Sequence, residues 1–196
     1  VGGRLVPRLL DAGYRVRCLV RDRARLEGRA WQTRVEIVEG DAMDAGSLNA
    51  AFQGVQSAYY LIHGMKGGQP NAEHDLQMAR NFSAAADRQG VKRIIYLGEL
   101  VDPGARLSAY LRSRHETGYL LRQSGIPVTE IRAGMIIGAG SALFEMIRYL
   151  TERVPIMICP SWVYTRIQPI AIGNVLDYLV ATLDVPASVG QIIEIG

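Results

Sequence analysis

Two glycines near the start of the chain could bring backbone close to an anionic ligand. Gly2 and Gly3 precede an apolar stripe at helical spacing that runs from Leu5 to Leu10. The amino end of a helix has unpaired N–H groups and attracts phosphate. If upstream residues form a strand and a glycine-rich turn, Gly2 would be the last glycine of a G-x-x-G-x-x-G turn that holds a pyrophosphate. Ordinary turn geometry explains the glycine pair equally well.

A basic residue follows the first predicted strand. Arg21 ends that strand and lies 19 residues beyond Gly2. In a dinucleotide-binding fold this position carries an acid for the ribose hydroxyls or a basic group for a 2′-phosphate. A guanidinium binds phosphate through two parallel hydrogen bonds, so Arg21 favours NADP over NAD. Asp22 beside it keeps NAD open, and a solvated surface arginine is the alternative interpretation.

Two more strand ends carry candidate cofactor contacts. After the second predicted strand, the Asp41 carboxylate could accept from an adenine amino group while Ala42 packs on the ring. Asp41 could equally be a turn or helix-capping residue. Leu61, Ile62 and His63 end the third strand, where backbone would pass the cofactor ribose. His63 could act on a substrate, although a structural role in a glycine-flanked loop is favoured.

The elements that must position these residues alternate between strand and helix. Strands are predicted over 14–20, 35–38, 57–62, 93–97, 128–131 and 192–195, and helices over 1–13, 44–52, 72–89, 107–123, 141–152 and 170–183. This alternation predicts an α/β fold, a Rossmann-like doubly wound parallel sheet that binds its ligand at the carboxyl ends of the strands. One domain is expected over 1–196, with 141–170 as a small C-terminal lobe that caps the ligand crevice.

Composition excludes several classes of protein. The 196 residues are 48% hydrophobic and 21% charged, which suits one folded domain and excludes disorder. The 22 basic and 19 acidic residues are interspersed, so no basic tract indicates a nucleic-acid partner. Cys18 and Cys159 lack metal-ligand spacing and are expected to be buried free thiols in a reducing, cytoplasmic compartment, with no metal site. No apolar run approaches the roughly 18 residues that cross a bilayer.

The ends of the chain suggest a fragment. It begins without a Met and directly in helical sequence, and it stops just after the strand predicted over 192–195. We therefore expect the N-terminal strand of the sheet to be missing from these residues. Such a strand would be central in the sheet.

Several motifs together resemble a known family. They are V-G-G-R-L-V at 1–6, L-V-R-D at 19–22, E-G-D at 39–41 and R-I-I-Y-L at 93–97. They resemble the extended and atypical short-chain dehydrogenase/reductases, and most of all the NmrA-like NAD(P)-binding proteins and the related nucleoside-diphosphate-sugar epimerase-like proteins. Segments 112–118, 124–132 and 167–172 are similar to the bacterial branch that often carries a C-terminal DUF2867 region. The resemblance covers essentially the whole chain and implies an NAD(P)-binding Rossmann-like domain.

The resemblance also implies a catalytic set. Catalytic members of this family use a Tyr-x-x-x-Lys pair and an upstream Ser or Thr. The lysine cation lowers the pKa of the tyrosine phenol and holds the nicotinamide ribose. The phenol then transfers a proton as the hydride moves. Tyr110 and Arg114 have this spacing, but arginine replaces lysine, and Gly98-Glu99 replaces the Ser or Thr. Tyr110 is either an acid/base with Arg114 as its cation, or a packing residue beside an Arg114 that binds cofactor or an internal carboxylate. We favour the second interpretation.

The substrate side is expected downstream. Gly134 follows the fifth strand, where family members usually show Arg-Pro-Gly and offer backbone to the nicotinamide amide; Ala133 departs from that proline. Phe144, Trp162 and Tyr164 could wall an apolar pocket or form the core of the capping lobe.

Two classes of function remain. One is an oxidoreductase or epimerase-like enzyme with an eroded Tyr-x-x-x-Lys site, which takes NADP(H), or else NAD(H), and an unidentified small molecule. The other is a non-catalytic dinucleotide sensor or assembly factor, in which bound cofactor biases contacts with a protein partner. Because arginine replaces the lysine and Gly98-Glu99 replaces the Ser or Thr, the second class is favoured more than it would be with an intact catalytic set.

Overall fold

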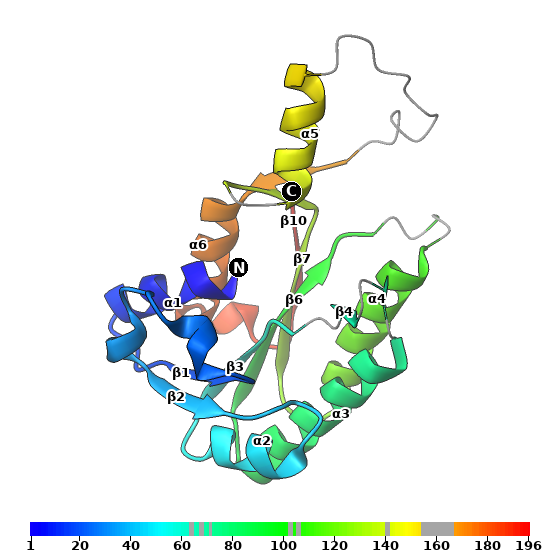
Figure 1. The fold of residues 1–196 in the computed structure, drawn as a ribbon. Helices are drawn as coiled ribbons and strands as arrows, with labels where there is room; N and C mark the ends of the chain where they lie inside the picture. The colour runs from blue at the N-terminus through cyan, green and yellow to red at the C-terminus, as the bar shows by residue number, and fades with distance from the viewer. Residues whose placement is uncertain are drawn as a thin grey trace.

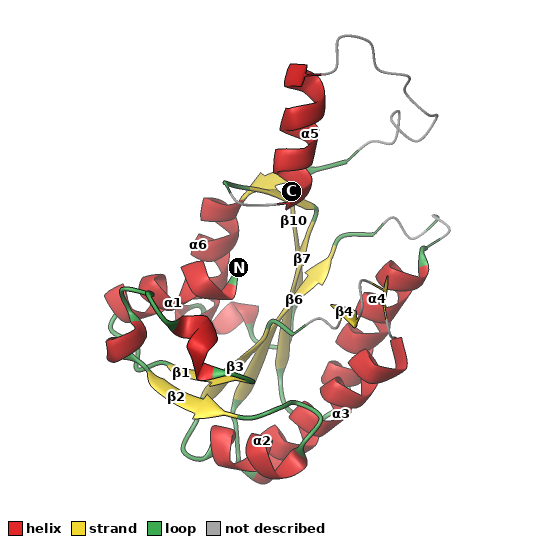
Figure 2. Ribbon diagram, viewed as in Figure 1, coloured by secondary structure: helices red, strands yellow, loops and turns green. Residues whose placement is uncertain are grey.

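In the computed structural model, helices pack on both faces of a parallel sheet (Figures 1 and 2). The structure describes residues 1–62, 65–66, 69–70, 72–101, 104, 107–139, 142–153 and 167–196. The helices are α1 (Gly2–Asp11), α2 (Ala45–Phe52), α3 (Ala72–Arg88), α4 (Ala109–Arg122), α5 (Ala142–Arg153) and α6 (Ile172–Asp184). The strands are β1 (Arg17–Val20), β2 (Glu36–Glu39), β3 (Ser57–Tyr60), β4 (Met65–Lys66), β5 (Gln69–Pro70), β6 (Arg93–Glu99), β7 (Val128–Ala133), β8 (Met135–Ile137), β9 (Pro169–Ala171) and β10 (Ile192–Ile195).

The middle layer consists of parallel strands. Four of them pair in the order β10-β7-β6-β3, and β1 pairs with β2 in a second parallel sheet. Within the described ranges no strand pairing joins β1 to β3, so the layer is divided between these two strands. The predicted doubly wound, Rossmann-like parallel sheet is confirmed, and a further strand upstream of Val1 stays a prediction.

Strand β6 shows why the sheet is covered on both faces. Its residues alternate between two hydrophobic cores: Ile94 and Tyr96 belong to one, and Ile95 and Leu97 to the other. All four are at most 7% exposed. A strand buried on both faces reads as a continuous apolar run, as the sequence does here.

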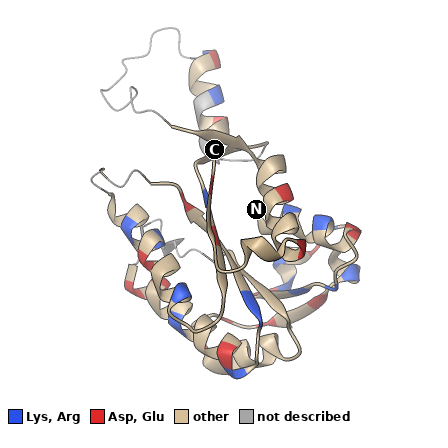
Figure 3. Cartoon of the chain, turned by 180° about the vertical axis from the view of Figure 1, so that it is seen from behind, with Lys and Arg blue, Asp and Glu red and all other residues tan. Residues whose placement is uncertain are grey.

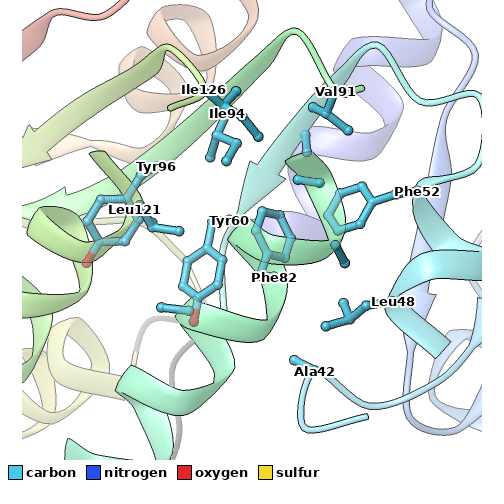
Figure 4. Close-up of a cluster of buried hydrophobic side chains, with 14 of the residues drawn as sticks. Ala42, Leu48, Phe52, Tyr60, Phe82, Val91, Ile94, Tyr96, Leu121 and Ile126 are labelled. Carbon is cyan, nitrogen blue, oxygen red and sulfur yellow. The ribbon is translucent and has the colours of Figure 1, made fainter. Parts of the chain in front are cut away.

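The two cores divide the helices. On one face, residues of α2, α3 and α4 pack around an aromatic cluster in which the Phe82 ring lies 4.7 Å from that of Phe52 and 4.9 Å from that of Tyr60 (Figure 4). On the other face, α1 and α6 pack together and against β6 and β7, with Leu5 and Leu179 nearly fully buried. Each helix contributes an apolar stripe, which burial in the core stabilises.

The element boundaries differ from the predictions in places. β1 begins at Arg17 rather than at 14, and β3 ends at Tyr60 rather than at 62. α4 begins at Ala109, because the Ser108 hydroxyl caps it by accepting from the Leu111 N–H at 3.2 Å.

Pairing between β8 and β9 was not predicted. Met135 lies opposite Pro169, and the prediction of a helix from 170 was wrong at its start, since α6 begins at Ile172. Trp162, Tyr164 and Cys159 lie outside the described residues, so the capping lobe over 141–170 stays a prediction.

The surface carries both acidic and basic residues, as the sequence predicts. Figure 3 shows acidic and basic residues interspersed over the helices in that view. Cys18 is a half-buried free cysteine, and burial raises the pKa of its thiol. Among the described residues no helix is long and apolar enough to cross a membrane, and no group of three metal-ligating side chains gathers.

Candidate functional site

The amino end of α1 lies beside the residues that follow β1 and β3. The Trp31 indole N–H donates to the Gly3 carbonyl at 3.2 Å, which ties the segment after β1 to the first turn of α1. A Cβ on Gly2 would lie 3.8 Å from a methyl group of Leu61, the residue directly after β3. Val1 supplies no side-chain cap, so described side chains leave the first N–H groups of α1 unpaired.

Arg21 and Asp22 have different surroundings. The Asp22 carboxylate accepts from the Ala24 N–H at 2.9 Å and caps the short 3₁₀ turn over Arg23–Leu26. The Arg21 side chain is exposed and has no hydrogen bond or ion pair to any described residue. The acid of this pair is therefore committed to a local cap, whereas the guanidinium is available to an anion.

Asp41 lies in a tight turn after β2. One of its carboxylate oxygens accepts from the Met43 N–H at 2.9 Å, and the Ser47 hydroxyl donates to its carbonyl at 2.9 Å. A Cβ on Gly40 would lie 2.5 Å from Ser47 Cβ, so the turn requires glycine there. Ala42 is 5% exposed and packs into the core of the α2–α3 face. The turn role expected as one alternative for Asp41 is present, and its adenine contact stays a prediction.

Arg114 joins β3, β6 and α4. Its guanidinium donates to the Ile62 carbonyl at 3.3 Å and to the Leu97 carbonyl at 2.6 Å. The same guanidinium lies 5.2 Å from the centre of the Tyr96 ring, and the Tyr96 hydroxyl donates to the Arg114 carbonyl at 2.8 Å. Arg114 is 7% exposed, so its buried guanidinium links α4 to β6 and to the residue that follows β3 by two positions. An ammonium lacks the planar fork that reaches both carbonyls.

Glu99, the last residue of β6, lies between Tyr110 and Arg114. The Tyr110 hydroxyl donates to Glu99 Oε1 at 3.3 Å, and Arg114 Nε lies 4.0 Å from the same oxygen. Burial raises the pKa of Tyr110, and the Glu99 charge raises it further, while Arg114 acts in the opposite direction. The net direction is upward, so the phenol is protonated at neutral pH.

Gly134 marks a close crossing of two segments. Its N–H donates to the Ile195 carbonyl at 3.3 Å. A Cβ on Gly134 would lie 2.0 Å from the Gln168 carbonyl oxygen, so the segment between β7 and β8 requires glycine where it passes the residue before β9. The expected contact with a nicotinamide amide stays a prediction.

The predicted site residues meet in two groups. Gly2 approaches Leu61, and Arg114 bonds to Ile62, while His63 lies outside the described residues. Sequence reasoning saw Glu99 as a departure from Ser or Thr and missed it as the hydrogen-bond partner of Tyr110. A charge at the end of an otherwise apolar strand was the available signal.

Asp75 is a second residue near Tyr110 that was not predicted from the sequence. Asp75 of α3 is 6% exposed and accepts from the Ser113 hydroxyl of α4 at 3.3 Å. Its charge also raises the pKa of Tyr110. No local sequence pattern marks Asp75 as buried, because its burial comes from the packing of α4 against α3.

The comparisons with known proteins show the family and the fold of the chain. The family model described as NAD(P)H-binding matches residues 1–147. The chain is 32% identical over 134 residues to a (4-alkanoyl-5-oxo-2,5-dihydrofuran-3-yl)methyl phosphate reductase of Streptomyces griseus, covering 67% of this chain and 43% of that protein. It is 29% identical over 102 residues to cinnamoyl-CoA reductase 1 of Oryza sativa, covering 49% of this chain and 30% of that protein. The chain thus spans less than half the length of these relatives.

Solved structures show the same fold. A nucleoside-diphosphate-sugar epimerase from Staphylococcus aureus superposes with a TM-score of 0.80 at 20% identity, covering 99% of this chain and 66% of the other. The Bordetella bronchiseptica enzyme WbmG, in complex with NAD and UDP, gives 0.78 at 19% identity, covering 100% and 68%.

The residues present fit a nicotinamide dinucleotide. The start of α1 is uncapped and begins with glycine, Arg21 is an unpaired cation after β1, and the buried Nε of Arg114 has no hydrogen-bond partner among the described residues. These groups suit a pyrophosphate, a ribose phosphate and a polar group near β6. From its family match, fold and site, the chain belongs to the NAD(P)H-binding protein family and has the Rossmann-like architecture of the extended short-chain dehydrogenase/reductases.

Proposed function

We propose that the protein is an NADP(H)-dependent oxidoreductase that reduces the carbonyl group of a small molecule. The matching curated proteins are named as reductases, which supports a reductase over an epimerase. When bound, the reduced nicotinamide supplies a hydride, and the protein must orient the two reactants and manage one proton. Tyr110, Arg114 and Gly134 would lie at the nicotinamide end of the cofactor.

The observation that carries the cofactor preference is the contrast between Arg21 and Asp22. An NAD-selective site needs a carboxylate free to accept from the ribose hydroxyls, and here the Asp22 carboxylate caps the following turn. An NADP-selective site needs a cation that is not already paired, and Arg21 meets that requirement among the described residues.

Other contacts would be shared by both cofactors. The amino end of α1 would receive the pyrophosphate, and Leu61 and Ile62 would line the path toward the nicotinamide. Asp41 and Ala42 would lie at the adenine. None of these contacts distinguishes NADP from NAD, so Arg21 is the residue to test.

A cofactor titration tests the proposal. We expect the unaltered protein to quench NADPH fluorescence with higher affinity than NADH, and Arg21→Ala to weaken NADPH binding about tenfold or more while NADH affinity changes little. Arg15→Ala is the matched control, because it removes an equal exposed charge just before β1. Equal affinities for the two cofactors that Arg21→Ala leaves unchanged would overturn the preference.

The sensor or assembly role has a separate signature. A protein that binds NADPH tightly and reduces no carbonyl compound would be such a sensor rather than an enzyme.

A further inference from the structure

Glu99 occupies a position suited to chemistry on a bound ligand. It is the last residue of β6, at the carboxyl end where a parallel sheet binds its ligands. The six preceding residues of the strand are buried, whereas the Glu99 side chain is 33% exposed. A carboxylate at this depth can reach both a ligand and water.

The two carboxylate oxygens of Glu99 have different surroundings. Oε1 accepts from the Tyr110 hydroxyl at 3.3 Å and lies 4.0 Å from Arg114 Nε. Oε2 accepts no hydrogen bond from any other described residue. The carboxylate is therefore held through one oxygen and open at the other.

Tyr110 is arranged as a donor rather than as a base. Its hydroxyl proton is directed to Glu99, and burial together with the Glu99 and Asp75 charges raises the pKa of the phenol. Arg114, the cation expected to favour the phenolate, has both terminal nitrogens on backbone carbonyls. With the Tyr110 hydroxyl directed to Oε1 and the terminal nitrogens of Arg114 on carbonyls, the open oxygen of the Glu99 carboxylate is the place in this set where a ligand proton can be held.

We infer that Glu99 is a catalytic residue, and that its Oε2 exchanges a proton with the reacting oxygen of the substrate while Tyr110 and Arg114 position it. The inference rests on the proposed reductase function. In reduction, a hydride from NADPH forms the new C–H bond, the C=O π bond breaks, and the oxygen takes the proton from the Glu99 carboxylic acid. The products are an alcohol, NADP⁺ and the Glu99 carboxylate, which takes up a proton (H⁺) from solvent before the next turnover.

The first test measures hydride transfer. NADPH oxidation by 4-nitrobenzaldehyde is followed by absorbance in the parent protein, Glu99→Gln and Tyr110→Phe. We expect Glu99→Gln to slow the reaction about a hundredfold or more, the size of general acid catalysis, and Tyr110→Phe to slow it only a few-fold. Glu116→Gln is the matched control, since it removes the same charge from an exposed position of α4 and is expected to leave the rate unchanged.

The second test needs no turnover. Benzoate would place its carboxylate where the substrate oxygen binds, and two carboxylates share such a site only with a proton between them. Calorimetric titration of benzoate into the NADP⁺-loaded parent is expected to show affinity that rises as the pH falls from about 8 to about 6. The Glu99→Gln variant keeps Tyr110, Arg114 and Asp75, and its benzoate affinity is expected to vary little with pH.

The outcomes separate the inference from the proposed function. If the parent does not bind NADPH, both fail together. If NADPH binds normally in all variants and Glu99→Gln reacts within about fivefold of the parent, the inference alone is overturned. An equal loss in Tyr110→Phe, a parent that transfers no hydride to the aldehyde, or a pH dependence of benzoate binding that persists in Glu99→Gln would also overturn it.

Discussion

The two ends of the proposed cofactor site are built by contacts of different range. After β1 and β2 the side chains bond to sequence neighbours: Asp22 and Asp41 each accept from the N–H two residues ahead. Around Arg114 the bonds cross the fold, reaching Ile62 across 52 positions and Leu97 across 17. Substitutions at the first end should therefore change ligand affinity, and substitutions at the second end should change the stability of the fold.

Replacing Arg114 should have the largest effect. Arg114→Met leaves the Ile62 and Leu97 carbonyls without their donor, and we expect the free energy of unfolding to fall by about 3–5 kcal/mol. Urea unfolding measures it. Arg21→Met is the matched change at the other end, and because its side chain is exposed the expected loss is within about 0.5 kcal/mol. Similar losses in both variants would remove the distinction between the two ends.

Replacing Gly134 tests how closely the segment between β7 and β8 packs against Gln168. Gly134→Ala would place a methyl group 2.0 Å from the Gln168 carbonyl oxygen. Relieving that overlap should cost about 1–3 kcal/mol of unfolding free energy. Gly173→Ala is the control, because a Cβ there meets nothing within 4 Å and the helix α6 gains stability from alanine. A Gly134→Ala protein as stable as the parent would show that the two segments separate easily.

At alkaline pH, the burial of Tyr96 beside Arg114 should cause a smaller loss of unfolding free energy. Burial raises the pKa of Tyr96 to about 12, above the ordinary value of 10.0. The folded chain then keeps a proton that the unfolded chain releases, so stability present below about pH 10 is lost as the pH rises toward 12. Tyr96 should contribute about 1.4 kcal/mol per pH unit in this window. Urea unfolding of Tyr96→Phe should show a shallower decline; an identical slope would contradict the account.

The fold was predictable where structure is local or periodic. The alternation of Ile94, Ile95, Tyr96 and Leu97 between two cores follows from an apolar strand, and it required helices on both faces. The helix predicted over 44–52 is also present, and the Asp44 carboxylate caps α2 by accepting from the Gly46 and Ser47 N–H groups. These features depend on residues within a few positions of one another.

Other features could not be predicted because they depend on distant partners. Pairing of β8 with β9, and the crossing of Gly134 with Gln168, bring together segments that no local pattern links. The hydrogen bond from Tyr110 to Glu99 likewise depends on how α4 lies over β6. The sequence supplied the residue types of the candidate site, and the packing of α4 supplied their pairing.

The most direct test is a crystal structure of the protein with NADP⁺ bound. The account predicts the 2′-phosphate within about 3 Å of the Arg21 guanidinium, the pyrophosphate at the amino end of α1, and the nicotinamide ring beside Glu99. A cofactor whose adenosine end lies away from Arg21, or whose nicotinamide lies away from the end of β6, would contradict it.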